Sequence, residues 1–107
     1  MAVADTLLAL ADPHRRQAVE KLALAPNSAG ELAASLGLTP AALTRHLRVL
    51  RRAGLVDLRL DPGDTRRHIY SLRADSIAEL ADWSQQITNF WKVQFASLTD
   101  YANQDGR

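Results

Sequence analysis

The chain has 107 residues, of which 47% are hydrophobic and 23% are charged, and it contains no cysteine. This composition is typical of one small globular domain, and a chain of this length buries only about two-thirds of its unfolded surface, so we expect a partner chain to complete the core. The missing thiols exclude disulfides, thiolate zinc sites, iron–sulfur clusters and cysteine-based redox sensing.

The charges are unevenly distributed along the chain. Thirteen Lys and Arg residues against 12 Asp and Glu give a formal net charge of +1. Residues 45–73 hold eight arginines and three aspartates, a net charge of +5, and the rest of the chain has a net charge of −4. A basic segment with acidic flanks indicates a local surface for an anionic partner that the total charge conceals.

The N-terminal ten residues lack the basic and apolar regions of a secretion signal. No apolar run approaches the ~20 residues that a membrane-spanning helix needs. We therefore expect a cytoplasmic protein without membrane contact.

The N-terminal quarter carries the signals of two helices. Asp5 is expected to cap a first, short helix, and Asp12 followed by proline marks the start of a second, which ends near residue 24. In the second helix, Arg15 and Arg16 are predicted to face water. Residues 1–24 are therefore assigned to two N-terminal helices.

Residues 28–54 have the pattern of a helix-turn-helix. Ser28 stands three residues before a glutamate, as in a capping box, and Gly37 ends the short helix that follows. Thr39 followed by proline opens a longer helix that runs through residue 53, and Gly54 ends it. The buried stripe of this longer helix is predicted from leucines at helical spacing, Leu43, Leu47 and Leu50.

The rest of the chain is predicted to form a hairpin and one long helix. Partial alternation on both sides of the turn cluster at residues 61–64 predicts a β-hairpin over residues 55–72. A helical pattern then runs from residue 75 to about residue 101, and we assign residues 74–103 to this C-terminal helix and expect a frayed tail beyond it. The predicted fold class is mainly α with a small β-hairpin, in one domain over residues 1–107.

The helix that begins after Thr39 is the strongest functional candidate. Its face opposite the leucine stripe offers short side chains near its start and arginines further along, which suits the major groove of DNA. Arginines beside the hairpin turn could contact phosphates or a minor groove. The candidate DNA-binding residues are Thr39, Ala41, Ala42, Thr44, Arg45, His46, Arg48, Arg51, Arg52, Arg66 and Arg67.

Four segments carry a resemblance to a known family: ALADPHRR at residues 9–16, GELA at residues 30–33, LTRHLRVLRRAGLV at residues 43–56 and RHIYSL at residues 67–72. Together they resemble the ArsR (SmtB-like) family of bacterial winged helix-turn-helix repressors over nearly the whole chain. The resemblance implies a homodimer that represses transcription by occupying an operator. It assigns recognition-helix roles to Thr44, Arg45, His46 and Arg48, and places Arg66 and Arg67 in the wing.

The chain departs from the metal-sensing members of that family. Ser28 and Gly30 stand near the positions of their Cys-x-Cys pair, and neither binds soft metals. The last helix, where other members use Asp and His, has no histidine. The three histidines, His14, His46 and His68, lie in separate predicted elements, so we predict no metal site and no cofactor.

The apolar stripe of the last helix is too wide for packing within one small domain. We interpret the surplus as a dimer interface shared with the first helix, and rank an effector pocket below that interpretation. A two-fold dimer predicts an inverted-repeat operator. The candidate interface residues are Leu7, Leu8, Leu10, Trp83, Ile87, Phe90, Trp91, Phe95 and Leu98.

Other functional classes fit less well. A winged-helix module that binds proteins and no longer reads DNA is the main alternative, but such a module would usually lose the basic face that this sequence keeps. No nucleophile–base spacing, phosphate loop or metal motif indicates an enzyme. The residues do not identify an effector: a small molecule, a protein partner and regulation by concentration alone all fit the sequence.

Overall fold

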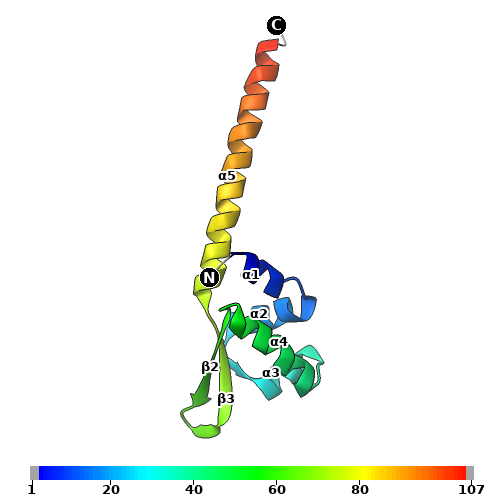
Figure 1. Cartoon of the computed structure of the whole chain (residues 1–107), viewed down its shortest axis with the longest axis vertical. Coiled ribbons are helices and arrows are strands. Elements are labelled where there is room, and N and C mark those ends of the chain that lie inside the picture. Colours follow the sequence, from blue (N-terminus) through cyan, green and yellow to red (C-terminus); the bar gives the residue numbers. More distant parts are fainter. Residues whose placement is uncertain (1–2, 106–107) are drawn as a thin grey trace.

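A computed structural model describes residues 3–105 of the chain. Four helices and a small antiparallel sheet form a body from which the last helix projects, with only its first turns packed against that body (Figure 1). The elements in chain order are α1 (Val3–Ala9), α2 (Pro13–Leu24), β1 (Asn27–Ser28), α3 (Ala29–Leu36), α4 (Pro40–Arg52), β2 (Val56–Asp61), β3 (Asp64–Leu72) and α5 (Ala74–Asp105). The predicted class, mainly helical with a small β-hairpin, is confirmed.

The start of α2 is fixed by its own sequence. The Asp12 side chain accepts hydrogen bonds from the amides of His14, at 2.8 Å, and Arg15, at 3.2 Å, so it is the N-cap that the sequence predicts. The prediction for α1 was wrong in one detail, because α1 begins at Val3 and Asp5 lies inside its first turn. An acidic residue there still complements the positive end of the helix dipole.

Arg16 is exposed, as predicted, whereas Arg15 is only half exposed, and the guanidinium groups of both bind the C-terminal end of α1. Arg15 Nε donates to the Ala9 carbonyl at 2.6 Å, and Arg16 Nη1 donates to the Leu10 carbonyl at 2.8 Å. The last carbonyls of a helix have no partner within it, and a cation near them is stabilising. The two arginines thus hold α1 against the start of α2.

The turn between α3 and α4 depends on Gly37. This residue has φ +67°, in the left-handed region that a glycine adopts at little cost, and the next amide, of Leu38, donates to the Ala33 carbonyl at 3.0 Å. Thr39 then caps α4 by accepting from the Ala42 amide at 3.2 Å. The predicted helix-turn-helix is therefore present, with α4 ending at Arg52, one residue before the predicted end.

The core lies where α2, α3 and α4 meet the sheet. The leucine stripe predicted for α4 is completely buried, and the other fully buried leucines are Leu32 and Leu55. Tyr70 of β3 closes the core from the sheet side with 9% of its surface exposed. This packing fixes which face of α4 turns outward.

The sheet has a third strand that the sequence did not reveal. β2 and β3 form the predicted hairpin, and β3 also pairs with β1 through Asn27↔Tyr70 and Ser28↔Ile69, giving the order β1-β3-β2. The two residues of β1 follow a helix break and carry no alternating pattern. Their pairing is created by the long-range approach of β3.

Helix α5 runs straight away from the body (Figure 1). It begins next to the end of α4, where Ser76 Oγ donates to the Gly54 carbonyl at 3.1 Å. It extends to Asp105, beyond the predicted end, so the frayed tail expected after residue 103 is helical as far as it is described, and residues 106–107 lie outside the described part. Between residues 3 and 105, no helix is long and apolar enough to cross a membrane.

Candidate nucleic-acid interface

The outward face of α4 carries the predicted recognition residues. Ala41, Thr44, Arg45 and Arg48 are exposed and lie opposite the buried leucine stripe. Arg51 and Arg52 continue this exposed surface in the last turn of the helix. The face offers small side chains near the N-terminus and long cationic ones toward the C-terminus, which is the arrangement expected for an approach to the major groove.

Ala42 and His46 lie on a different flank of α4. Both are only half exposed, and His46 Nδ1 is 3.5 Å from Arg15 Nη1 of α2. The His46 ring therefore turns toward α2, away from the face that carries Arg45 and Arg48. The helical period explains this placement, since residue 46 comes three residues after Leu43 and four before Leu50 and therefore lies at the edge of the buried stripe.

Two hydroxyl groups of the predicted site have structural partners. Thr39 caps α4, as described above, and Thr44 Oγ1 donates to the Pro40 carbonyl one turn earlier, at 2.8 Å. Both side chains remain exposed. Thr39 thus stabilises the start of α4, in addition to any contact it makes with a partner.

The arginines of α4 form no ion pair with another described residue. The ion pairs between residues 3 and 105 that involve arginine are made by Arg66, Arg67 and Arg73. All four arginines of α4 are exposed and outside these pairs, namely Arg45, Arg48, Arg51 and Arg52. A cluster of guanidinium groups outside ion pairs attracts phosphates over a range of one Debye length, ~8 Å at physiological salt.

The two arginines of the β2–β3 hairpin differ from each other. Arg66 has 93% of its side chain exposed, with Nε 3.7 Å from Asp64. Arg67 Nη2 lies 2.7 Å from Glu31 Oε1 of α3, and its side chain is 42% exposed. Arg66 is therefore free to reach a partner, whereas Arg67 is bound to the body of the protein.

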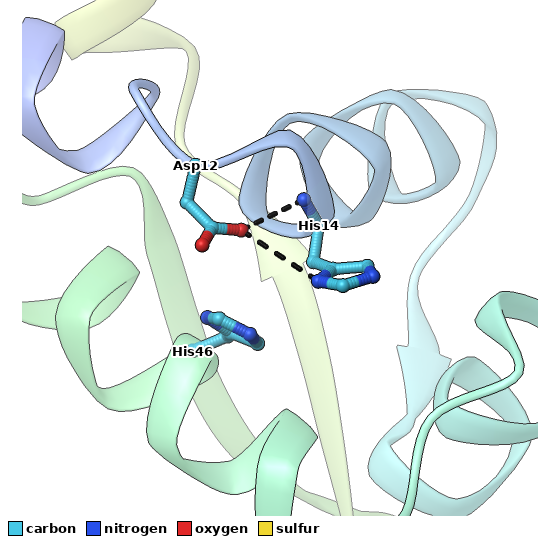
Figure 2. Close-up of side chains that lie close together, drawn as sticks. All are labelled: Asp12, His14 and His46. Atoms are coloured by element: carbon cyan, nitrogen blue, oxygen red, sulfur yellow. Dashed lines mark hydrogen bonds and ion pairs between the residues drawn. The ribbon is translucent and has the colours of Figure 1, made fainter.

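Asp12, His14 and His46 gather between the start of α2 and α4, as Figure 2 shows. The two imidazole rings have centroids 5.7 Å apart, and His14 Nδ1 lies 3.9 Å from Asp12 Oδ1. Desolvation raises the pKa of the Asp12 carboxyl, but the hydrogen bonds from the Arg15 and His14 amides outweigh it and lower that pKa below its usual value, with a further lowering from the charges of His46 and Arg15. His14 and His46 thus lie side by side, although they are far apart in the sequence and belong to different helices.

The candidate interface on α5 is exposed along its whole length. Phe90 is 67% exposed, Trp91 61%, and Leu98 64%. The sequence-based list missed Val93 and Tyr101, which are equally exposed, although Tyr101 belongs to the same helical pattern. The other predicted interface residues of α5 are also exposed, namely Trp83, Ile87 and Phe95.

The predicted interface residues at the N-terminal end of the chain differ in exposure. Leu7 and Leu8 are exposed, at 43% and 69%. Leu10 is half-buried and packs against the core of its own chain. The structure therefore gives Leu10 an intramolecular role, because the chain turns inward after α1.

A helix-turn-helix followed by a β-hairpin wing, with basic side chains on the second helix, defines the class of winged-helix transcriptional regulators. The sequence profile described as "Bacterial regulatory protein, arsR family" matches residues 12–58. The chain belongs to this family of DNA-binding transcriptional regulators.

Relatives and solved structures support this assignment. The HTH-type transcriptional regulator Rv2034 of Mycobacterium tuberculosis is 42% identical over 94 residues, which span 88% of this chain and 79% of that protein. The HTH-type transcriptional regulator NmtR of the same organism is 39% identical over 82 residues, 75% of this chain and 64% of that protein. An ArsR-like transcriptional regulator from Rhodococcus sp. RHA1 superposes with a TM-score of 0.81 at 26% identity, over 94% of this chain and 92% of that structure.

Proposed function

We propose that this regulator is a homodimeric repressor that binds an inverted-repeat operator in double-stranded DNA. The observation that carries the proposal is the set of four exposed arginines on α4, none of which forms an ion pair with another described residue. With α4 in the major groove, Arg45 and Arg48 reach guanine edges or phosphates, and Thr44 and Ala41 allow the helix backbone to approach closely.

The wing supplies a second contact. Arg66 projects from the hairpin with 93% of its side chain exposed, so it is open to contact with DNA phosphates or a minor groove. Arg67 supports this contact indirectly, because its bond to Glu31 fixes β3 to α3. In this arrangement α4 reads sequence, and the wing adds affinity that does not depend on sequence.

The dimer is supported by the exposed apolar surface of α5. Along α5, Ile87 follows Trp83 by four residues and Phe90 follows Ile87 by three, while Leu98 follows Trp91 by seven. At about 100° per residue, these five side chains, Trp83, Ile87, Phe90, Trp91 and Leu98, share one face of the helix. Beyond its first turns, which pack against α1 and the core, α5 projects into water without tertiary packing to stabilise it. So large an apolar stripe is rare on a monomer. A second copy of the same helix would cover the stripe, and the two-fold symmetry would present two copies of α4 to successive half-sites about 34 Å apart.

Repression then follows from occupancy, since a dimer bound over a promoter excludes other proteins from the same DNA. Steep salt dependence is expected, because each neutralised phosphate releases condensed counterions. An effector that releases the dimer from DNA is not needed for this activity and is not part of the proposal.

Selection of bound sequences from random double-stranded DNA by the full chain tests the proposal directly. The expected product is an inverted repeat with half-site centres one helical turn apart, and a promoter carrying it should be silenced in a reporter strain that expresses the chain. Recovery of no enriched sequence would reject DNA reading in favour of a protein-binding role. Enrichment of a single, unrepeated half-site would reject the dimer.

A further inference from the structure

The cluster at the start of α2 has the chemistry of a metal site. We propose that Asp12, His14 and His46 bind one divalent transition-metal ion of the zinc type. One ligand atom from each of the three residues lies within 4.8 Å of the others. Two imidazole nitrogens and one carboxylate oxygen are a donor set suited to zinc and its neighbours, and three protein ligands leave a fourth position for water.

Helix capping uses only part of the Asp12 carboxylate. Both backbone hydrogen bonds go to Oδ1. The other oxygen points toward His46 in Figure 2, into the space between α2 and α4. It is therefore the oxygen available to a cation.

The ligand atoms of the three residues must move slightly closer together to bind a metal ion. Zinc bonds of about 2.0–2.2 Å in a tetrahedral arrangement place neighbouring ligand atoms about 3.4 Å apart, so the widest separation here must shrink by up to about 1.4 Å. His14 is exposed, with 48% of its side chain open to solvent, and is free to turn by rotation of its own torsions. Asp12 and His46 are more restrained and supply the fixed part of the site.

Arg15 is the positively charged group beside the cluster. Its contact with His46 Nδ1, at 3.5 Å, is long, whereas its Nε holds the Ala9 carbonyl at 2.6 Å and its Nη2 approaches the Leu8 carbonyl at 3.4 Å. A metal ion at His46 displaces only the weak contact, and the guanidinium stays anchored on α1. A metal ion here would join the N-terminus of α2 to α4, the helix that the proposed function places on DNA.

The test uses the full chain without a histidine tag, freed of metal by chelation, and needs no DNA. Titration with zinc sulfate in a calorimeter should show one ion per chain. His14→Gln and His46→Gln should each weaken binding by at least about tenfold, since even the loss of a supporting contact to a metal ligand costs that much. His68→Gln is the matched control, because His68 is exposed on the wing and outside the cluster, and it should bind zinc as the parent chain does.

Cobalt(II) provides a second readout. Its visible absorption should show the bands of tetrahedral coordination in the parent chain and lose them in His14→Gln, whose exposed position leaves the fold intact. Absence of zinc binding, binding that either cluster variant leaves unchanged, or equal weakening by His68→Gln would each overturn the proposal. None of these outcomes depends on DNA, so failure of the metal site and failure of the proposed function are distinguishable.

Discussion

Arg67 of β3 and Glu31 of α3 form an ion pair with Nη2 and Oε1 2.7 Å apart, although they are 36 residues apart in the sequence. The pair joins the wing to the helix that precedes α4. The orientation of the wing relative to α4, the proposed recognition helix, thus depends in part on Glu31, which belongs to neither element.

Glu31→Gln should loosen the wing without unfolding the chain. Both side chains are substantially exposed, so the loss in the free energy of unfolding should be only about 0.2–1 kcal/mol, and it should vanish at high salt. Thermal melts at low and high salt measure the stability, and amide exchange along β3 measures the loosening. Asp64→Asn, which removes the longer contact to Arg66, is the control and should change less. An equal effect of the two variants would mean that the Glu31 pair has no special role.

Arg45→Ala should weaken operator binding by about 1–3 kcal/mol and relax the base preference at one position of each half-site. The reason is that Arg45 lies on the exposed face of α4 with no counter-charge among the described residues. Competition gel shifts with operators altered one base pair at a time provide the measurement. Lys21→Ala, an exposed cation on α2, should bind as the parent chain does; if it weakened binding as much, the effect would be one of total charge.

Arg66→Ala should weaken binding to all sequences alike. A phosphate contact carries no base information, so the expected signature is a decrease of about one in the slope of log K against log salt concentration. Affinities at several salt concentrations, for operator and random DNA, measure that slope. Lys92→Ala on α5 serves as a remote control, and a change of base preference in Arg66→Ala would place the residue against a base edge instead.

Phe90→Asp should convert the dimer into a monomer and reduce operator affinity, because only one half-site can then be held by each chain. Phe90 is 67% exposed within one chain, so the substitution has little effect on the fold of that chain. Sedimentation equilibrium at micromolar concentrations gives the mass. Asn89→Asp adds the same charge about 100° around α5 from Phe90, outside the apolar stripe, and should remain dimeric. A dimeric Phe90→Asp variant would contradict the proposed interface.

Thr39→Ala should lower the free energy of unfolding by about 1 kcal/mol, the usual cost of losing an N-cap hydroxyl. Thr44→Ala is the matched control, since its hydroxyl bonds back to a carbonyl within the same helix and its loss should stay within about 0.5 kcal/mol. Denaturant melts of both variants and the parent chain measure these two losses in the free energy of unfolding. Equal stability of Thr39→Ala and the parent chain would show that the cap is dispensable.

Much of the fold was predictable because its signals are local. Asp12 and Thr39 each precede a proline, and Gly37 supplies the left-handed turn, so the boundaries of α2, α3 and α4 follow from a few neighbouring residues. The leucine stripe of α4 also follows from spacing alone. Strand β1 was missed because two residues carry no periodicity, and its partners in β3 lie 43 and 41 residues further along the chain, at Asn27↔Tyr70 and Ser28↔Ile69.

The candidate site was predictable only in part. The outward face of α4 follows from the position of its buried stripe, which places Arg45 and Arg48 correctly on the exposed surface. The inward turn of His46, its proximity to His14 and the pairing of Arg67 with Glu31 all depend on how distant elements pack. Spacing along the chain gives no measure of such distances.

The junction at Gly54 and Leu55 has a mechanical consequence. The Gly54 carbonyl accepts from Ser76 Oγ, and the Leu55 carbonyl accepts from the Arg73 amide at 2.8 Å, so the end of α4 and the start of α5 share one hinge. At 1.5 Å per residue, the 32 residues of α5 form a lever about 48 Å long. A rotation of about 5° at the hinge displaces the far tip by about 4 Å, so the chain magnifies small angular changes at one end into large displacements at the other.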